Sequence, residues 1–215
     1  MKQIRYIWTC TQMKIVNSRM AAFALLMFFL AWNYNMPVRR FVQEMDYPVS
    51  WCVFPFILTA STYLFVFWFG VIYVNSDIPF LQHAGMYQIM RTGRRVWVVG
   101  QIGAVIVRSI TIVCIAALCT VISLFPRIEF TNDWGKLLRT MALPGEVNRL
   151  AFRYDIYYDA LVEYTPVQLM MLTLLIGILA SAFMGILMFL ICLYTNKVTA
   201  VVVTSAFVIL YRDFM

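Results

Sequence analysis

Charged residues are scarce in this sequence, and histidine is nearly absent. Of 215 residues, 13% are charged and one, His83, is a histidine, whereas a typical soluble domain has about 25% charged residues. One histidine cannot build a histidine-rich metal site. The apolar stretches contain no carboxylate pair, no HExxH, no GxSxG and no P-loop. The sequence therefore predicts no catalytic residue, no metal and no cofactor.

Cysteine pairs at metal-binding or redox spacing are also missing. The five cysteines lie in or beside apolar segments without a CxxC pair, as expected for small buried side chains. The net charge is +7, but the cations are dispersed at the ends of apolar runs. This distribution is typical of topology signals and contacts with lipid headgroups. It predicts a lipid bilayer as the surroundings and no nucleic-acid partner.

Long apolar runs are what the sequence has in abundance, with 63% hydrophobic residues. A crossing of about 30 Å of hydrocarbon needs roughly 20 apolar residues. We predict an all-α, polytopic transmembrane helical bundle that forms one domain over 1–215, with about five spans: 20–36, 51–74, 97–125, 166–194 and 198–211. The last run reaches only about 21 Å. It is either a weak fifth crossing or a sign that the bundle lacks a closing helix.

The segments between the runs give the expected orientation. Residues 1–19 fit a basic amphipathic helix in the interface, or a flexible tail. The first span has four cations before it and two after it, which places the N-terminus in the cytoplasm. The polar segment 126–165, which holds most of the acids, is then extracytoplasmic, and 75–96 is a cytoplasmic loop or helix.

The stretch 75–96 has the features of a short helix. Ser76 or Asp77 can cap its start, and Pro79 suits its first turn. Gly93 can end it, and Trp97 can anchor the next span at the headgroups. Apolar residues recur on one face at helical spacing, namely Phe80, Leu81, Ala84, Tyr87 and Met90. Arg94 and Arg95 are expected to keep the end in the cytosol.

Two features lie inside the predicted spans. Arg108 is about eleven residues past Trp97 and has no obvious intramembrane acid as a partner. An arginine at that depth lines a translocation path, makes a polar contact between helices, or snorkels from a protruding helix. Gly177, Ser181 and Gly185 recur every four residues. Such a stripe lets helices approach closely, either within the chain or across a dimer.

Residues 75–101 resemble a known family of membrane proteins. The Ser-Asp-x-Pro after the second span, Tyr87, the run "IMRTGRRVW" and the Gly-Gln at 100–101 resemble permeases of bacterial ABC-2-type exporters, particularly small uncharacterised ones from Firmicutes. The basic N-terminal stretch is similar to the elbow helix of that family. The residue-level likeness is confined to about 75–101, and such permeases typically have six spans.

The resemblance implies a permease subunit in the bacterial plasma membrane that exports an amphiphilic peptide or lipid-like substrate. A separate ABC ATPase would hydrolyse ATP, and permeases would pair as homodimers or heterodimers. The stretch would be a coupling helix whose ATPase contacts are Asp77, Pro79, Phe80, Tyr87, Arg91, Arg94 and Arg95. Two alternatives stay open: the substrate-binding membrane component of an importer, and a membrane protein that confers immunity or senses a signal without transport.

Overall fold

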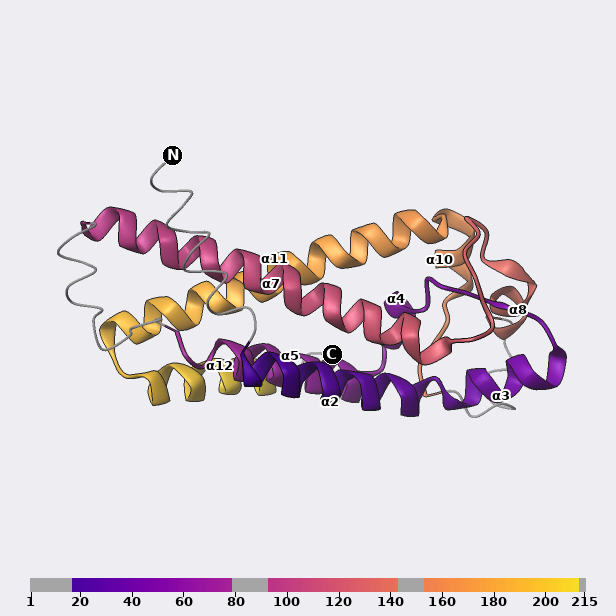
Figure 1. Ribbon diagram of the computed structural model, residues 1–215, viewed down its shortest axis with the longest axis horizontal. Helices are drawn as coiled ribbons and strands as arrows, with labels where there is room; N and C mark the ends of the chain where they lie inside the picture. The colour runs from indigo at the N-terminus through magenta and orange to yellow at the C-terminus, as the bar shows by residue number, and fades with distance from the viewer. Residues whose placement is uncertain (1–16, 79–92, 143–152, 213–215) are drawn as a thin grey trace. The chain divides into compact units, whose positions relative to one another are not determined.

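The computed structural model describes residues 17–78, 93–142 and 153–212 (Figure 1). Within these ranges the regular secondary structure is helical apart from one pair of two-residue strands, which confirms the all-α prediction. The chain divides into two compact units. The first comprises Met1–Phe23, Phe67–Val113 and Gly177–Met215, and the second comprises Ala24–Val66 and Cys114–Ile176.

Two described helices are long and apolar enough to cross a membrane, α7 (Arg94–Leu124) and α11 (Pro166–Tyr194). A third candidate is the pair α2 (Ser18–Tyr34) and α3 (Met36–Met45), which is bent by 47°. The length and apolar composition of these helices indicate a membrane protein. Two or three candidate spans among the described residues leave the five crossings as a prediction.

The first predicted span, 20–36, corresponds to α2, which ends at Tyr34, and the chain then continues as α3. Proline is tolerated in the first turn of a helix, where its missing N–H would have no partner. Pro37 accordingly lies in the first turn of α3, which continues to Met45. Only the last three residues of the predicted amphipathic helix over 1–19 are described, and two of them, Ser18 and Arg19, begin α2.

The second predicted span, 51–74, is two helices rather than one. α4 (Phe54–Ile57) starts at a proline turn, and α5 (Ser61–Asn75) follows after a break. At the break, the Thr59 hydroxyl donates to the carbonyl of Phe56 at 2.7 Å. The apolar residues before the break, including Val53 and Phe56, are buried in the second unit. They form part of a protein core, which a run of apolar residues cannot reveal.

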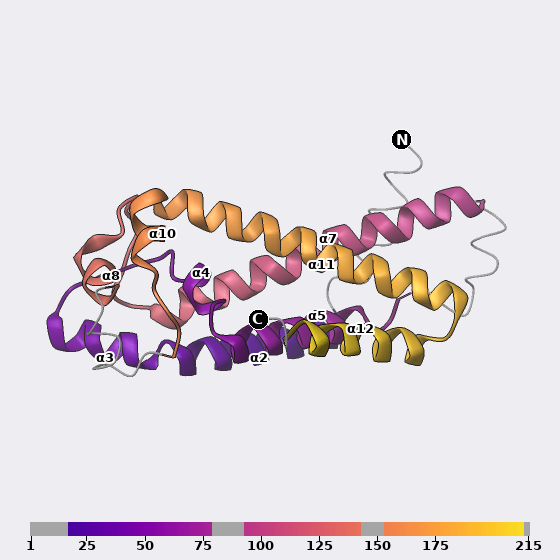
Figure 2. The same ribbon diagram turned by 180° about the vertical axis from the view of Figure 1, so that it is seen from behind.

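The last predicted span is a helix of nearly the predicted length. α12 (Lys197–Arg212) contains 16 residues and turns back from the end of α11 (Figures 1 and 2). Ala200, Thr204 and Val208 are its buried residues, spaced four apart, and most of its other described residues are exposed or half-buried. α12 therefore packs along one narrow stripe. Whether it crosses a membrane stays a prediction.

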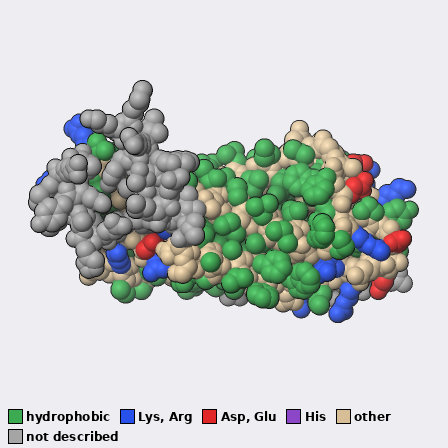
Figure 3. Space-filling view, in the orientation of Figure 1, with side chains coloured by type: hydrophobic (Ala, Val, Ile, Leu, Met, Phe, Trp, Pro, Cys, Tyr) green, Lys and Arg blue, Asp and Glu red, His purple; other side chains and the backbone are tan. Residues whose placement is uncertain are grey.

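The segment predicted to be extracytoplasmic folds in the second unit. β1 (Val49–Ser50) pairs in parallel with β2 (Ile128–Glu129), and α8 (Gly135–Met141) lies beside β1. The buried Trp134 donates from its indole to the carbonyl of Tyr164, just after α10 (Tyr158–Glu163), at 2.8 Å. Figure 3 shows charged side chains gathered over the end of this unit that carries α3, α8 and α10.

A buried polar network joins three parts of the second unit. The Asn35 amide donates to the Ser123 hydroxyl at 2.6 Å, and the Tyr154 hydroxyl donates to the Asn35 carbonyl oxygen at 3.3 Å. Burial raises the pKa of the Tyr154 phenol above its ordinary value. These hydrogen bonds satisfy polar groups where α2, α7 and the segment before α10 meet.

Candidate functional site

Arg108 is the charged residue most deeply placed in α7. It follows fourteen residues after Arg94, the start of that helix, and its side chain is only 3% exposed. Its neighbours along the helix are mostly apolar, "AVIV" before it and "SITIV" after it. A buried guanidinium needs an acceptor for its N–H groups and a counter-charge. The first unit supplies both.

The counter-charge is Asp77, two residues past the end of α5. Arg108 Nη1 lies 2.7 Å from Asp77 Oδ1, and Nη2 lies 3.4 Å from Oδ2. This is a two-pronged contact, the geometry in which arginine and carboxylate pair most strongly. The partner of Arg108 is thus an acid outside the predicted spans, in the segment 75–96, and not an acid within them.

Arg108 also closes the end of α5. Its Nη1 donates to the carbonyl of Val74 at 3.0 Å. The last four carbonyls of a helix have no partner within it, and the helix dipole favours a cation at that end. One guanidinium therefore satisfies a backbone carbonyl of α5 and neutralises the carboxylate that follows it.

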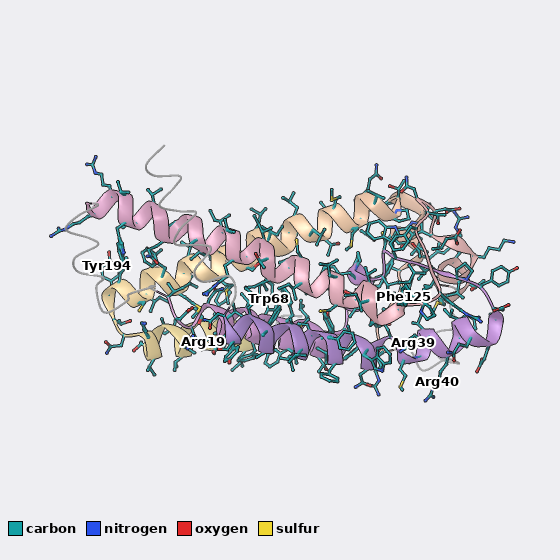
Figure 4. The ribbon with its side chains drawn as sticks, viewed as in Figure 1. Arg19, Arg39, Arg40, Trp68, Phe125 and Tyr194 are labelled. Carbon is teal, nitrogen blue, oxygen red and sulfur yellow. The ribbon has the colours of Figure 1, made fainter. Side chains whose placement is uncertain are left out.

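A second arginine, Arg19 in the first turn of α2, reaches the same turn (Figure 4). Its Nη1 donates to the Ser76 hydroxyl at 2.7 Å and lies 4.0 Å from Asp77 Oδ1. Ser76 in turn donates to the carbonyl of Tyr73 at 2.8 Å. The turn thus has two cations around one carboxylate.

Asn75, the last residue of α5, is fully buried beside α11. Neither its amide nitrogen nor its amide oxygen has a hydrogen-bond partner among the described residues. It faces Gly185, where a Cβ would lie 3.5 Å from the Asn75 amide nitrogen and 2.5 Å from Val105 Cγ1. The glycine is what allows α11 to approach both α7 and the end of α5 at this point.

The residue after Asp77 fixes the turn by apolar contact. Ile78 is buried in a cluster with Trp97 and Val105 of α7 and Phe189 of α11. The Trp97 and Phe189 rings lie 5.9 Å apart between centroids. The turn 76–78 is therefore attached to α7 by an ion pair and to both α7 and α11 by packing.

The other residues predicted to contact an ATPase are only partly described. Pro79, Phe80, Tyr87 and Arg91 lie outside the described residues, together with the predicted helix that contains them. Gly93 has φ +82, a left-handed conformation that glycine adopts at little cost. Arg94 and Arg95 are exposed, but they form the first turn of α7 and do not precede it.

The predicted stripe of small residues faces α7 within the chain. A Cβ at Gly177 would lie 3.3 Å from Val113 Cγ1, and Gly185 lies against Val105. Ser181 is buried and donates to the carbonyl of Gly177 at 2.6 Å. Of the two arrangements that the sequence leaves open, these are contacts inside one chain.

The arrangement links the end of α5 to α2, α7 and α11. Among the described residues, no three His, Cys, Asp or Glu side chains come together as metal ligands. The charged groups at the turn, Arg19, Asp77 and Arg108, are engaged with one another and with helix ends. Together with the packing of Ile78, these contacts attach the turn 76–78 to α7 and α11.

Sequence reasoning does not identify Arg19 or Asn75 as members of this site. The available signal is the polar run Asn75-Ser76-Asp77 after an apolar helix. Arg108, the partner of Asp77, lies 31 residues away from it in sequence, and Arg19, the partner of Ser76, lies 57 residues away. Nothing in the spacing links positions so far apart. Comparisons with family models, with curated proteins and with solved structures gave no match.

Proposed function

We propose that this chain is the permease subunit of an ATP-driven membrane exporter, with ATP hydrolysed by a separate cytoplasmic ATPase subunit. The observation that carries the proposal is the turn 76–78, which is attached to α7 and α11 directly before the predicted ATPase-contact segment. In this scheme the chain contributes no catalytic residue. Its own task is to convert movement at that segment into movement of membrane helices.

The proposed transmission has two routes. A displacement of the segment that begins at Pro79 pulls on α7 through the Asp77–Arg108 ion pair. It also pulls on α7 and α11 through Ile78, which is packed between them. Packed interfaces shift between discrete arrangements and resist gradual deformation. A small movement of the turn is therefore passed to the long helices without being absorbed locally.

The remaining roles follow the family resemblance. Arg108 lies along the translocation path, and Phe80, Tyr87, Arg91, Arg94 and Arg95 contact the ATPase together with Asp77 and Pro79. Two permease chains, identical or different, enclose the path for an amphiphilic peptide or lipid-like substrate. The chain resides in the bacterial plasma membrane with its N-terminus in the cytoplasm. The apolar lengths of α7 and α11 support the membrane placement.

Co-purification with a candidate ABC ATPase from the same source tests the proposal. We expect the two proteins to purify together and the chain to stimulate ATP hydrolysis. Tyr87→Ala and Arg94→Glu should abolish the stimulation without reducing expression, because both change the proposed contact. Asp77→Asn should also lose stimulation, because it removes both the ion pair of the proposed transmission and a proposed ATPase contact.

Arg40→Glu serves as the control for a charge reversal, because Arg40 is an exposed residue of α3 in the second unit. It should behave as wild type. The proposal is wrong if no ATPase binds, or if Tyr87→Ala, Arg94→Glu and Asp77→Asn all stimulate hydrolysis as well as wild type does.

A further inference from the structure

α3 has the properties of a helix that lies in a membrane interface. It turns by 47° from α2, so it leaves the direction of that apolar helix. Its buried residues, Val38, Phe41 and Val42, lie on one side, while Arg40 and Gln43 are exposed. The apolar face of α3 is thus covered by protein, and the helix exposes Arg40 and Gln43 directly after an apolar helix, as is expected near headgroup level.

Exposed side chains of the second unit indicate the same boundary. Phe29 of α2 is 67% exposed, and Leu118 and Ile122 of α7 are exposed too. Such apolar side chains suit contact with acyl chains. Trp32 near the end of α2 and Phe125 just after α7 are also exposed. Aromatic residues are enriched where the hydrocarbon ends, so this end of the unit is placed at headgroup level.

A shallow groove lies at this level between α3 and the residues that follow α7. Its buried lining is apolar and consists of Val42, Val49 and Leu124. Its polar lining comes from Arg39, Gln43 and Arg127. Phe125 lines it as well, and Figure 4 shows Arg39 nearer to Phe125 than Arg40 is.

The two arginines of the groove differ in what they already bind. Arg127 forms an ion pair with Asp46 and donates to the carbonyl of Val42 at 3.4 Å. The guanidinium carbon of Arg39 lies 3.8 Å from the centroid of the Trp32 ring. Within the described part of the chain, Arg39 has no ion-pair partner. Stacking fixes the plane of its guanidinium and leaves the N–H groups at its edge able to bind an anion.

We propose that this groove binds the phosphate of an anionic phospholipid headgroup through Arg39. Arginine presents a planar fork of donors that matches phosphate oxygens, and Gln43 adds a neutral donor at the same rim. Basic pockets beside membrane helices bind lipid headgroups in this manner. The acyl chains would extend over the exposed apolar surface of Phe29, Leu118 and Ile122.

A lipid fits the groove better than free phosphate does. Only one of its two arginines lacks an internal counter-charge, so the groove offers an anion little more than a single unneutralised cation. A headgroup compensates for this weak electrostatic contact because its acyl chains bury against apolar surface at the same time. Free phosphate gains nothing from that surface.

Lipid binding to the full purified chain tests the proposal, with native mass spectrometry counting bound lipids in detergent. The probes are phosphatidylglycerol and phosphatidylcholine at equal concentration. We expect wild type to prefer phosphatidylglycerol, and Arg39→Gln to bind it about tenfold more weakly, the size expected for losing a charge-assisted hydrogen bond. Arg40→Gln is the matched control, since it removes the neighbouring charge outside the groove, and it should bind as wild type.

A second variant covers the case that Arg39→Gln unfolds. Gln43→Glu changes an exposed residue, so it should fold, and its new negative charge should weaken phosphatidylglycerol binding. Inorganic phosphate alone should not displace the lipid at millimolar concentration. The proposal is overturned if Arg39→Gln and Arg40→Gln reduce binding equally, if Gln43→Glu binds as wild type, if the two lipids bind alike, or if inorganic phosphate competes.

Discussion

At the Arg108–Asp77 pair, water reaches one partner much better than the other. The Arg108 side chain is 3% exposed and the Asp77 side chain 25% exposed. Without Arg108, the Asp77 carboxylate would still meet water and the nearby Arg19. Without the charge of Asp77, the buried Arg108 would lose the carboxylate that lies 2.7 Å from its guanidinium. Breaking a buried pair is costly mainly through the charge left behind.

This asymmetry predicts different costs for the two single substitutions. Asp77→Asn should lower the free energy of unfolding by about 3–5 kcal/mol, the usual cost of breaking a buried ion pair by removing one partner. Arg108→Met should cost less, because methionine fills much of the same space without a charge. Thermal unfolding in detergent measures both.

The double variant Asp77→Asn with Arg108→Met is the internal control. It should recover most of the stability lost in Asp77→Asn, since no buried charge remains. If Arg108→Met is the more damaging single substitution, or if the double variant is the least stable of the three, the charge left behind is not the dominant cost.

The sequence predicts that Arg108 is unusual, but it does not predict which residue Arg108 contacts. The depth of Arg108 in an apolar run identifies it as unusual, because charges are rare there. The identity of its partner depends on α5 ending alongside the middle of α7, and no local pattern encodes that. Asp77 is predicted as a helix cap or an ATPase contact from its neighbours in sequence, whereas its carboxylate pairs with a residue 31 positions later.

At the scale of elements, α7 and α11 pack closely along the face that carries the small residues. The two glycines of that stripe differ in the space available. A Cβ at Gly185 would lie 2.5 Å from Val105 Cγ1, which is too close for two carbon atoms, whereas at Gly177 the nearest distance is 3.3 Å from Val113 Cγ1. Val105 is fully buried and has little room to move.

We expect Gly185→Ala to lower the free energy of unfolding by about 1–3 kcal/mol, the usual cost of overpacking. Gly177→Ala should change it by less than about 1 kcal/mol, because the gain in helix propensity offsets a mild contact. The same substitution in the same helix makes each variant the control for the other. Thermal unfolding in detergent would contradict this expectation if Gly177→Ala were the less stable variant.

The sequence predicts some elements closely and others not at all. α7, α11 and α12 lie within three residues of their predicted bounds, because turn residues flank each long apolar run. The run 51–74 is just as apolar, yet its first part is a buried core segment and only α5 is a longer helix. Apolar composition cannot distinguish contact with lipid from contact with protein.

At the scale of the whole molecule, the open question is which segments face which side of the membrane. The proposed orientation puts 126–165 outside and the turn between α11 and α12 inside. One candidate span, α11, separates the two regions. Asn132 and Asn196 are exposed residues in them, so they are suitable sites for a label.

Single cysteines at these positions test the orientation. In a variant with all five native cysteines replaced, Asn132→Cys should react with a membrane-impermeant maleimide on intact cells. Asn196→Cys should react only after the membrane is disrupted. Mass shift on a gel reports the labelling. The reverse pattern would invert the orientation, and labelling of both sites on intact cells would exclude α11 as a crossing.

The order in which the chain is synthesised gives the Arg108–Asp77 pair a second expected role, during membrane insertion. A ribosome releases α5 and Asp77 first, and Arg108 emerges 31 residues later. An arginine at the centre of an inserting helix costs about 2.5–3.5 kcal/mol. When α7 enters the bilayer, Asp77 has already been synthesised at the end of the preceding helix, and its carboxylate can neutralise the arginine. We therefore expect the Asp77 carboxylate to assist the insertion of α7, so that a chain that loses Asp77 inserts less efficiently and is also less stable once folded.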